Sequence, residues 1–328
     1  MKRISKILVV MEGKYDSQAM IAEVSAIADN DTKVTLLGVV NPPPVDPELQ
    51  VAIFDDYELT ATAQLEELSK LGMEMERAGI STTVQQAAGN SYEQVIRTAV
   101  AGGFDMVIKP AENEGGQLRL LFGSTDMQLF RMSPDPVWLF KPTPAGKLDK
   151  VMVAVDLLAS DEEKSALAVK VLEWGKYVAE TVDAELHIVH IWDLYKEVLL
   201  RGRVGHSYVN SLLDDVEKRH GRWLGNAIAR SGINPAKVNI HLRKGDAKEM
   251  IPVIARDENI DLLVMGTVGR TGIPGFFIGN TADSVLRQVD CSVLAIKPDG
   301  FKTPVAIKKP LTLVTSLQDF NTRQRSVA

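Results

Sequence analysis

Three glycines separated by two and nine residues are the strongest chemical signal in this 328-residue sequence. Gly266, Gly269 and Gly279 follow an apolar run at residues 261–265 and precede an expected helix that begins near Thr281. Glycine adopts positive φ readily, and successive bare N–H groups form a concave nest that holds phosphate oxygens. The amino end of a helix adds further N–H groups that favour an anion. The spacing therefore predicts a loop that binds a phosphate group.

Polar side chains lie next to these glycines and next to a second predicted strand. Arg270 can add charge-assisted hydrogen bonds to a phosphate. Asn280 and Thr281 follow the last glycine, and an asparagine amide can donate hydrogen bonds although it is bulkier than a hydroxyl. Asp156 directly follows the apolar run 151–155. At the carboxyl end of such a strand, a carboxylate can accept hydrogen bonds from a sugar hydroxyl.

The sequence repeats itself at a fixed distance, which is the main evidence for its organisation. Residues of the first half recur 156 positions later with the same identity: Gly89, Glu93, Ala99, Asp105, Gly123, Thr125, Arg131, Val137, Lys141 and Pro142. The first strands of the two halves, residues 6–10 and 150–154, also resemble one another, at a spacing of 144. The chain therefore consists of two copies of one fold.

Each half alternates short apolar runs with helical segments, which is typical of an α/β fold with a parallel sheet. In the second half the expected strands are residues 151–155, 185–191, 237–242, 261–265 and 292–296. We expect two tandem doubly wound, Rossmann-like domains at residues 1–143 and 148–299, followed by a tail at 300–328. Prolines and a glycine at residues 141–147 break regular structure between the two domains.

The first half lacks the features of the glycine loop. The 156-residue offset places Pro110 where the second half has Gly266, and Asn113 where it has Gly269. Proline has no N–H group to donate to a phosphate. Ser124 keeps a hydroxyl after the equivalent of Gly279, but it is isolated. We expect no nucleotide in the first half.

The loop and the segment from Gly279 to Ala282 resemble those of the universal stress protein (UspA) superfamily, and most closely its tandem, UspE-type branch. The resemblance covers nearly both halves and implies an adenine-nucleotide α-hydrolase-like fold. It implies that the second half binds ATP or another adenine nucleotide, which Mg²⁺ can accompany. Asp156 would lie near the ribose, Ile191 would offer backbone groups to adenine, and the glycines would surround the phosphates. The residues implied to bind the nucleotide are Val155, Asp156, Ile191, Gly266, Gly269, Arg270, Gly279, Asn280 and Thr281.

Composition and motifs exclude several other classes of function. A formal charge of −6 opposes binding to a nucleic-acid backbone, and no run approaches the roughly 20 apolar residues of a membrane span. Cys291 is the single cysteine, so no internal disulfide forms, which agrees with a cytoplasmic protein. The sequence has no Walker, dinucleotide, HExxH or GxSxG pattern, so we predict no catalytic residues and no metal site. A slow ATPase activity stays open.

Two hypotheses about function follow. The first is a non-catalytic stress-response factor that binds an adenine nucleotide; the second is a nucleotide-free module that binds a hydrophobic ligand or a protein partner. Apolar residues at 194–200 could serve the second, but we favour ordinary packing of an amphipathic helix for them. The last strands of the two halves, residues 137–142 and 293–298, are expected to pair as an intramolecular pseudo-dimer, and a homodimer stays open.

Overall fold

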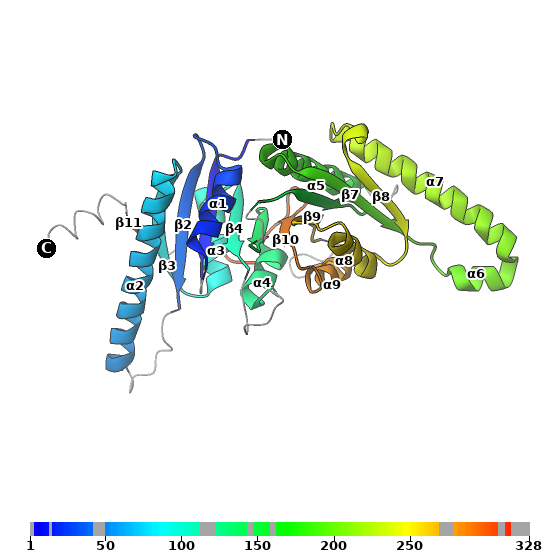
Figure 1. The fold of residues 1–328 in the computed structure, drawn as a ribbon. Coiled ribbons are helices and arrows are strands. Elements are labelled where there is room, and N and C mark those ends of the chain that lie inside the picture. The colour runs from blue at the N-terminus through cyan, green and yellow to red at the C-terminus, as the bar shows by residue number, and fades with distance from the viewer. Residues whose placement is uncertain are drawn as a thin grey trace. The chain divides into compact units, whose positions relative to one another are not determined.

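The computed structural model divides the chain into two compact units. One unit holds the first half together with residues 302–307 and 312–315, and the other holds most of residues 148–301 (Figure 1). The structure describes residues 3–12, 15–41, 50–111, 122–142, 147–157, 162–268, 278–307 and 312–315. Each unit is a mostly parallel sheet covered by helices, as the repeat in the sequence predicts.

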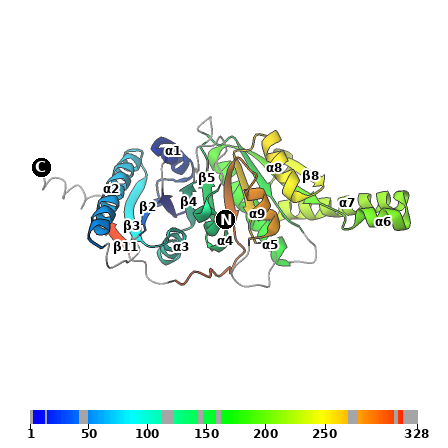
Figure 2. The same cartoon turned by 90° about the horizontal axis from the view of Figure 1, so that it is seen from below.

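The N-terminal unit alternates strands and helices along the chain. Its elements are β1 (Lys6–Met11), α1 (Ser17–Ile27), β2 (Lys33–Val40), α2 (Gln50–Arg77), β3 (Ser81–Ala88), α3 (Ser91–Gly102), β4 (Met106–Pro110), α4 (Ser124–Met132) and β5 (Val137–Phe140). The strands lie side by side in the order β3-β2-β1-β4-β5, all parallel. Helix α1 contacts α2, α3 contacts α4, and α1 and α3 lie on opposite faces of the sheet (Figure 2).

The C-terminal unit repeats this arrangement. Its elements are β6 (Lys150–Ala154), α5 (Glu162–Val182), β7 (Glu185–Trp192), α6 (Glu197–Val204), α7 (His206–Arg230), the 3-10 turn η1 (Pro235–Lys237), β8 (Asn239–Lys244), α8 (Ala247–Asp257), β9 (Leu262–Gly266), α9 (Asn280–Leu286) and β10 (Ser292–Ile296). The parallel strands lie in the order β8-β7-β6-β9-β10. Helix α5 contacts α7 and α8 contacts α9.

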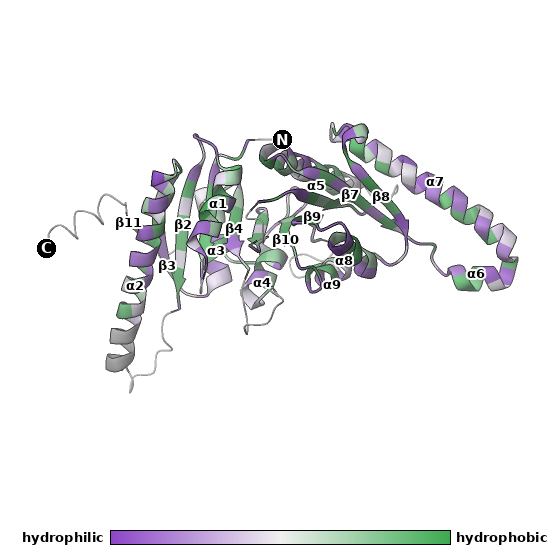
Figure 3. Ribbon diagram, viewed as in Figure 1, coloured by the Kyte–Doolittle hydropathy of each residue, from purple (hydrophilic) through white to green (hydrophobic). Residues whose placement is uncertain are grey.

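The core of each unit lies in its central strands, whose residues are mostly hydrophobic (Figure 3). Strand β1 is buried at every residue after Lys6, and strand β10 is buried throughout. The expected strands of the second half lie within two residues of the observed ones. For β6, β7, β9 and β10 the reason is that strands covered on both faces must be apolar on both faces.

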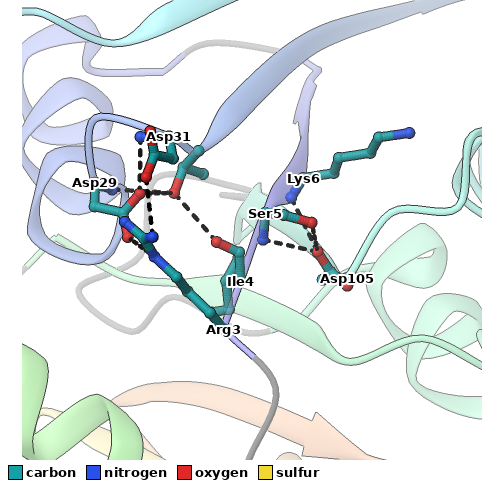
Figure 4. A network of polar contacts seen from close by, with 8 residues as sticks. Arg3, Ile4, Ser5, Lys6, Asp29, Asp31 and Asp105 are labelled. Carbon is teal, nitrogen blue, oxygen red and sulfur yellow. Dashed lines mark hydrogen bonds and ion pairs between the residues drawn. The ribbon is translucent and has the colours of Figure 1, made fainter.

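One aspartate in each unit fastens the start of the first strand to the start of the fourth. Asp105 Oδ2 accepts hydrogen bonds from the backbone N–H of Ser5 at 2.8 Å and of Lys6 at 3.0 Å (Figure 4). Asp261 Oδ2, 156 positions later, accepts the N–H of Asp149 and of Lys150, both at 2.9 Å. The repeated aspartate therefore has a structural role that explains its place in both halves.

The tail contributes a strand that the sequence did not predict. Strand β11 (Thr312–Thr315) pairs antiparallel with β3 at the edge of the N-terminal sheet. Before this strand, the Ala306 carbonyl accepts a hydrogen bond from Arg97 Nε at 3.0 Å. The pairing of the two halves as a pseudo-dimer stays a prediction.

Candidate functional site

The strand order of the C-terminal unit creates one position where a ligand can lie beyond the strand ends. The chain passes from β6 to β7 on one side of β6 and returns to β9 on the other side. Ligands of doubly wound sheets bind outside the carboxyl ends of the strands at this point. Val155 and Asp156 come directly after β6, and Gly266 ends β9. Val155 is buried, whereas the Asp156 side chain is exposed.

The glycines differ from the expected nest in two respects. Gly266 has no positive φ; it closes strand β9, and a Cβ atom there would lie 2.9 Å from Leu167 Cδ2 of helix α5. Gly279 has φ −61°, and its N–H donates to the Thr267 carbonyl at 2.9 Å. The prediction of a positive φ is therefore wrong for Gly266, whose smallness serves close packing of α5 on β9. Gly269 and Arg270 lie outside the described residues.

The other predicted residues lie at the carboxyl ends of the strands. Ile191 is the penultimate residue of β7, where it is in register with Arg243 of β8. Asn280 and Thr281 are exposed and begin helix α9. The carboxyl ends of strands β6, β7 and β9 thus bring Asp156, Ile191 and Gly266 to the same end of the sheet, as their order in the sequence implies.

A pair of histidines holds the end of β6 in place. His190 is 1% exposed, and its Nδ1 lies 3.0 Å from the Val155 carbonyl, so Nδ1 must carry the proton of this hydrogen bond. In neutral His190 the Nε2 atom is then an acceptor, and His220 Nδ1 donates to it at 2.8 Å. Burial lowers the pKa of His190, so the neutral form is favoured. The carbonyl of Val155, next to Asp156, is therefore fixed by a side chain from β7.

Aromatic rings extend this arrangement onto helix α7. The His220 ring stacks on Trp192 with centroids 5.7 Å apart and meets Trp223 edge-on at 4.7 Å. Beside Trp223 is a groove of about 390 Å³, whose lining residues are Leu157, Ser165, Trp223, Asn226, Ala227, Ala229 and Arg230. Arg230 Nη1 donates to Ser165 Oγ at 3.3 Å across it. Apolar and polar groups line one groove next to the end of β6, which suits a ligand with an aromatic or aliphatic part.

The same position in the N-terminal unit is filled by charged side chains. Lys109, in β4, and Asp126, in α4, are both 0% exposed, and Lys109 Nζ lies 2.9 Å from Asp126 Oδ1. Lys109 Nζ also lies 3.5 Å from Glu12 Oε2, which comes directly after β1. Asp126 Oδ2 accepts the Gly123 N–H at 3.1 Å. The N–H group at the start of α4 is thus hydrogen-bonded to the Asp126 carboxylate, and the Lys109 ammonium group lies beside that carboxylate.

The 156-residue offset shows how the second half differs. Met265 stands where Lys109 does, and Ala282 stands where Asp126 does. Neither residue carries a charge, so the C-terminal unit has no ion pair between these two positions. Sequence reasoning missed Lys109 and Asp126, although a lysine within the apolar strand β4 was a signal for a buried partner.

Helix α6 also departs from expectation. None of its residues is buried, and Val198 and Leu199 are 86% and 48% exposed. Our preference for ordinary packing of residues 194–200 is therefore wrong for these two side chains. Glu197 fixes the helix instead, through contacts with Arg201 Nη2 at 2.7 Å and with Lys244 Nζ.

Within the described ranges, no group of three or more His, Cys, Asp or Glu side chains is arranged to hold a metal ion. Nor does that part of the chain contain a helix long and apolar enough to cross a membrane.

Two tandem doubly wound domains with this strand order define the class of the protein. A family model described as "Universal stress protein family" matches residues 3–141 and again residues 147–297. The chain belongs to the universal stress protein family.

Individual relatives agree with this assignment. Universal stress protein E of Escherichia coli K12 is 32% identical over 217 residues, which are 66% of this chain and 68% of that protein. The universal stress protein E homolog of Haemophilus influenzae is 23% identical over 90% of this chain and 98% of its own length. A functionally unknown protein of Pseudomonas aeruginosa shares the fold, with a TM-score of 0.67, 24% identity and coverage of 91% and 94% of the two chains.

Proposed function

We propose that this protein is a non-catalytic stress-response factor that binds ATP or a related adenine nucleotide in its C-terminal half. The single observation that carries the proposal is the contrast between the two sets of strand ends. In the N-terminal unit the buried Lys109 and Asp126 fill the position with protein charge. In the C-terminal unit Met265 and Ala282 replace them, Asp156 is exposed, and a groove of about 390 Å³ lies alongside.

The residues available for binding divide by the part of the nucleotide that they suit. Asp156 can accept hydrogen bonds from the ribose hydroxyls. Phosphate binding would depend on Gly269, Arg270, Asn280 and Thr281 more than on Gly279, because the Gly279 N–H already donates to Thr267. Mg²⁺ would be held mainly by the phosphate oxygens of the nucleotide. Binding without turnover is supported by the lack of a catalytic motif in the sequence.

Calorimetric titration of the full chain with Mg-ATP tests the proposal. We expect one nucleotide per chain, and we expect Gly269→Val to abolish binding because side-chain bulk enters the phosphate path. Asp156→Ala should weaken binding about tenfold, the effect of losing a hydrogen bond to a charged group. Asp257→Ala removes the same charge from the exposed end of α8 and should leave affinity unchanged.

Three outcomes would contradict the proposal. No binding at millimolar ATP would exclude a nucleotide role. Two nucleotides per chain would show that the N-terminal unit binds as well. Equal affinity in Gly269→Val would show that the phosphates lie elsewhere.

A second candidate function is a nucleotide-free module that binds a hydrophobic ligand or a protein partner, and the exposed apolar residues of α6 favour it. Val198 and Leu199 lie on a helix without buried residues. Mass spectrometry of small molecules released from the purified full chain separates the two candidates. An adenine nucleotide supports the first, whereas an acyl compound or no small molecule supports the second.

A further inference from the structure

The two units differ at the edge formed by their third strands. In the N-terminal unit β11 pairs antiparallel with β3, with Thr312 opposite Ala87 and Thr315 opposite Val84. In the C-terminal unit the equivalent strand is β8, and among the described residues it pairs with β7 alone. The 156-residue offset maps the covered positions of β3 onto residues 240–243 of β8. The position that receives a strand in one unit therefore receives none from the described residues in the other.

The side chains at the two edges are buried to different extents. Val84 in β3 is 0% exposed, whereas Ile240 at the same place in β8 is 43% exposed. Helix α2 lies over β3, and the Gln86 Nε2 group donates to the Ala61 carbonyl of that helix at 2.8 Å. In the C-terminal unit an apolar groove of about 200 Å³ lies between α7 and β8, and Gly225, Ile228, Pro235, Ile240 and Leu242 line it. The side chains of a strand paired with β8 would cover this groove.

Backbone groups of β8 point toward the open side. The Gly245 N–H donates to the Trp192 carbonyl of β7 at 2.9 Å. Because successive residues of a strand direct their N–H and C=O groups to opposite sides, those of Ile240, Leu242 and Lys244 point away from β7. Unpaired strand edges are templates for pairing with another chain.

We propose that β8 is a dimerisation strand, which pairs antiparallel with β8 of a second copy across a two-fold axis. A two-fold axis makes the strands antiparallel, which is also the orientation of β11 on β3. Placing His241 on the axis pairs Ile240 with Leu242 of the second copy and roofs both grooves with apolar side chains. The same register sets Arg243 opposite Asn239, so that a cation lies across from a residue that is hydrogen-bonded to the Glu185 carboxylate.

This register allows a cross-linking test on the full chain. Facing residues on the axis that form no hydrogen bonds with one another have Cα atoms about 4.5 Å apart, which a disulfide can bridge. We expect His241→Cys to form a covalent dimer under mild oxidation. Arg243→Cys lies two residues from the axis on the same sheet face and is the matched control, with the wild-type chain reporting on Cys291. Equal cross-linking of both variants, or none in His241→Cys, would overturn the proposed pairing.

A second pair of variants tests the backbone hydrogen bonds. Ile240→Pro removes an N–H that points away from β7, and Ile240→Thr keeps it; proline is tolerated on an open strand edge. Two-fold symmetry removes two hydrogen bonds, so Ile240→Pro should raise the dimer dissociation constant about 30-fold. Sedimentation velocity measures the constant, and circular dichroism confirms folding. A folded Ile240→Pro dimer as tight as Ile240→Thr would overturn the proposal.

Amide hydrogen exchange of the wild-type chain gives a readout that needs no variant. The Ile240 and Leu242 amides should exchange about tenfold more slowly at a concentration where the chain is dimeric than where it is monomeric. A monomer at all concentrations, or a dimer in which these amides keep the monomer rate while α6 is protected, would overturn the proposal and place the contact elsewhere.

Discussion

The two halves share strand order and helix placement, yet they use the ends of the central strands in opposite ways. The N-terminal unit buries Lys109 against Asp126 and Glu12. In the C-terminal unit, Met265 and Ala282 stand at the positions of Lys109 and Asp126, and the exposed Asp156 follows strand β6. A fold that offers a ligand position by its topology must either keep that position open or fill it with side chains whose charges are paired. The N-terminal unit takes the second course, with Lys109 paired to Asp126.

The largest expected effect comes from removing the buried cation of the N-terminal unit. Lys109→Met installs the residue that the C-terminal unit carries, but it removes the cation that both the buried Asp126 and Glu12 contact. Breaking a buried ion pair in this way costs about 3–5 kcal/mol. Urea unfolding of the full chain, followed by circular dichroism, measures the loss.

The double variant Lys109→Met with Asp126→Ala is the matched control. It reproduces the residue pair of the second half and removes both buried charges, so most of the lost stability should return. The remaining deficit should be about 1 kcal/mol, because the Gly123 N–H loses its acceptor. If the single and double variants were equally unstable, charge pairing would not be what fills this position.

The two halves also differ in histidine content, because all five histidines lie in the C-terminal half. Burial is the first cause that lowers the pKa of four of them: His187, His190, His220 and His241. These side chains form two pairs, with ring nitrogens 3.0 Å apart for His187 and His241 and 2.8 Å apart for His190 and His220. Each pair keeps one ring neutral so that it can accept a hydrogen bond.

We expect the C-terminal unit to lose stability as the pH falls below about 6.5, the ordinary pKa of histidine. The unfolded chain binds protons there that the folded unit does not, so the free energy of unfolding falls by up to about 1.4 kcal/mol per pH unit for each such histidine. Above that pH the contribution is fully present. Thermal unfolding followed by tryptophan fluorescence between pH 7.5 and 5.5 measures the slope, because three of the four tryptophans lie in this half.

Two glutamine variants sharpen this pH test. His220→Gln removes a ring that is paired with His190, and should reduce the slope. His206→Gln removes an exposed ring at the start of α7, and should leave it unchanged. A slope that both variants reduce equally would show that the buried pairs are not its source.

The repeat made the fold predictable, whereas the details of the site depended on contacts that spacing does not reveal. Apolar runs located the central strands because strands covered on both faces must be apolar throughout. The four residues of β11 carry little signal by themselves, since a strand this short owes its stability to pairing with β3.

Glycine spacing also left the function of each glycine undetermined. A glycine is required either for a positive φ or for close approach of another group, and only the position of Leu167 shows that Gly266 serves close approach. Lys109 was overlooked for a similar reason, because its partner Asp126 is distant in sequence and belongs to another element.

The smallest expected effect tests what the end of β9 requires. The N-terminal unit carries Pro110 at the place of Gly266, and proline holds φ near −65°, so this position does not demand positive φ in either half. Gly266→Ala should cost about 1 kcal/mol, because its Cβ atom must displace the end of the Leu167 side chain, and should leave ATP affinity unchanged. Gly225→Ala, in α7 with nothing within 4 Å of the added Cβ, should instead stabilise the chain by about 0.5–1 kcal/mol. Urea unfolding measures both changes in stability. Loss of ATP binding in Gly266→Ala would show that this glycine contributes to the phosphate site.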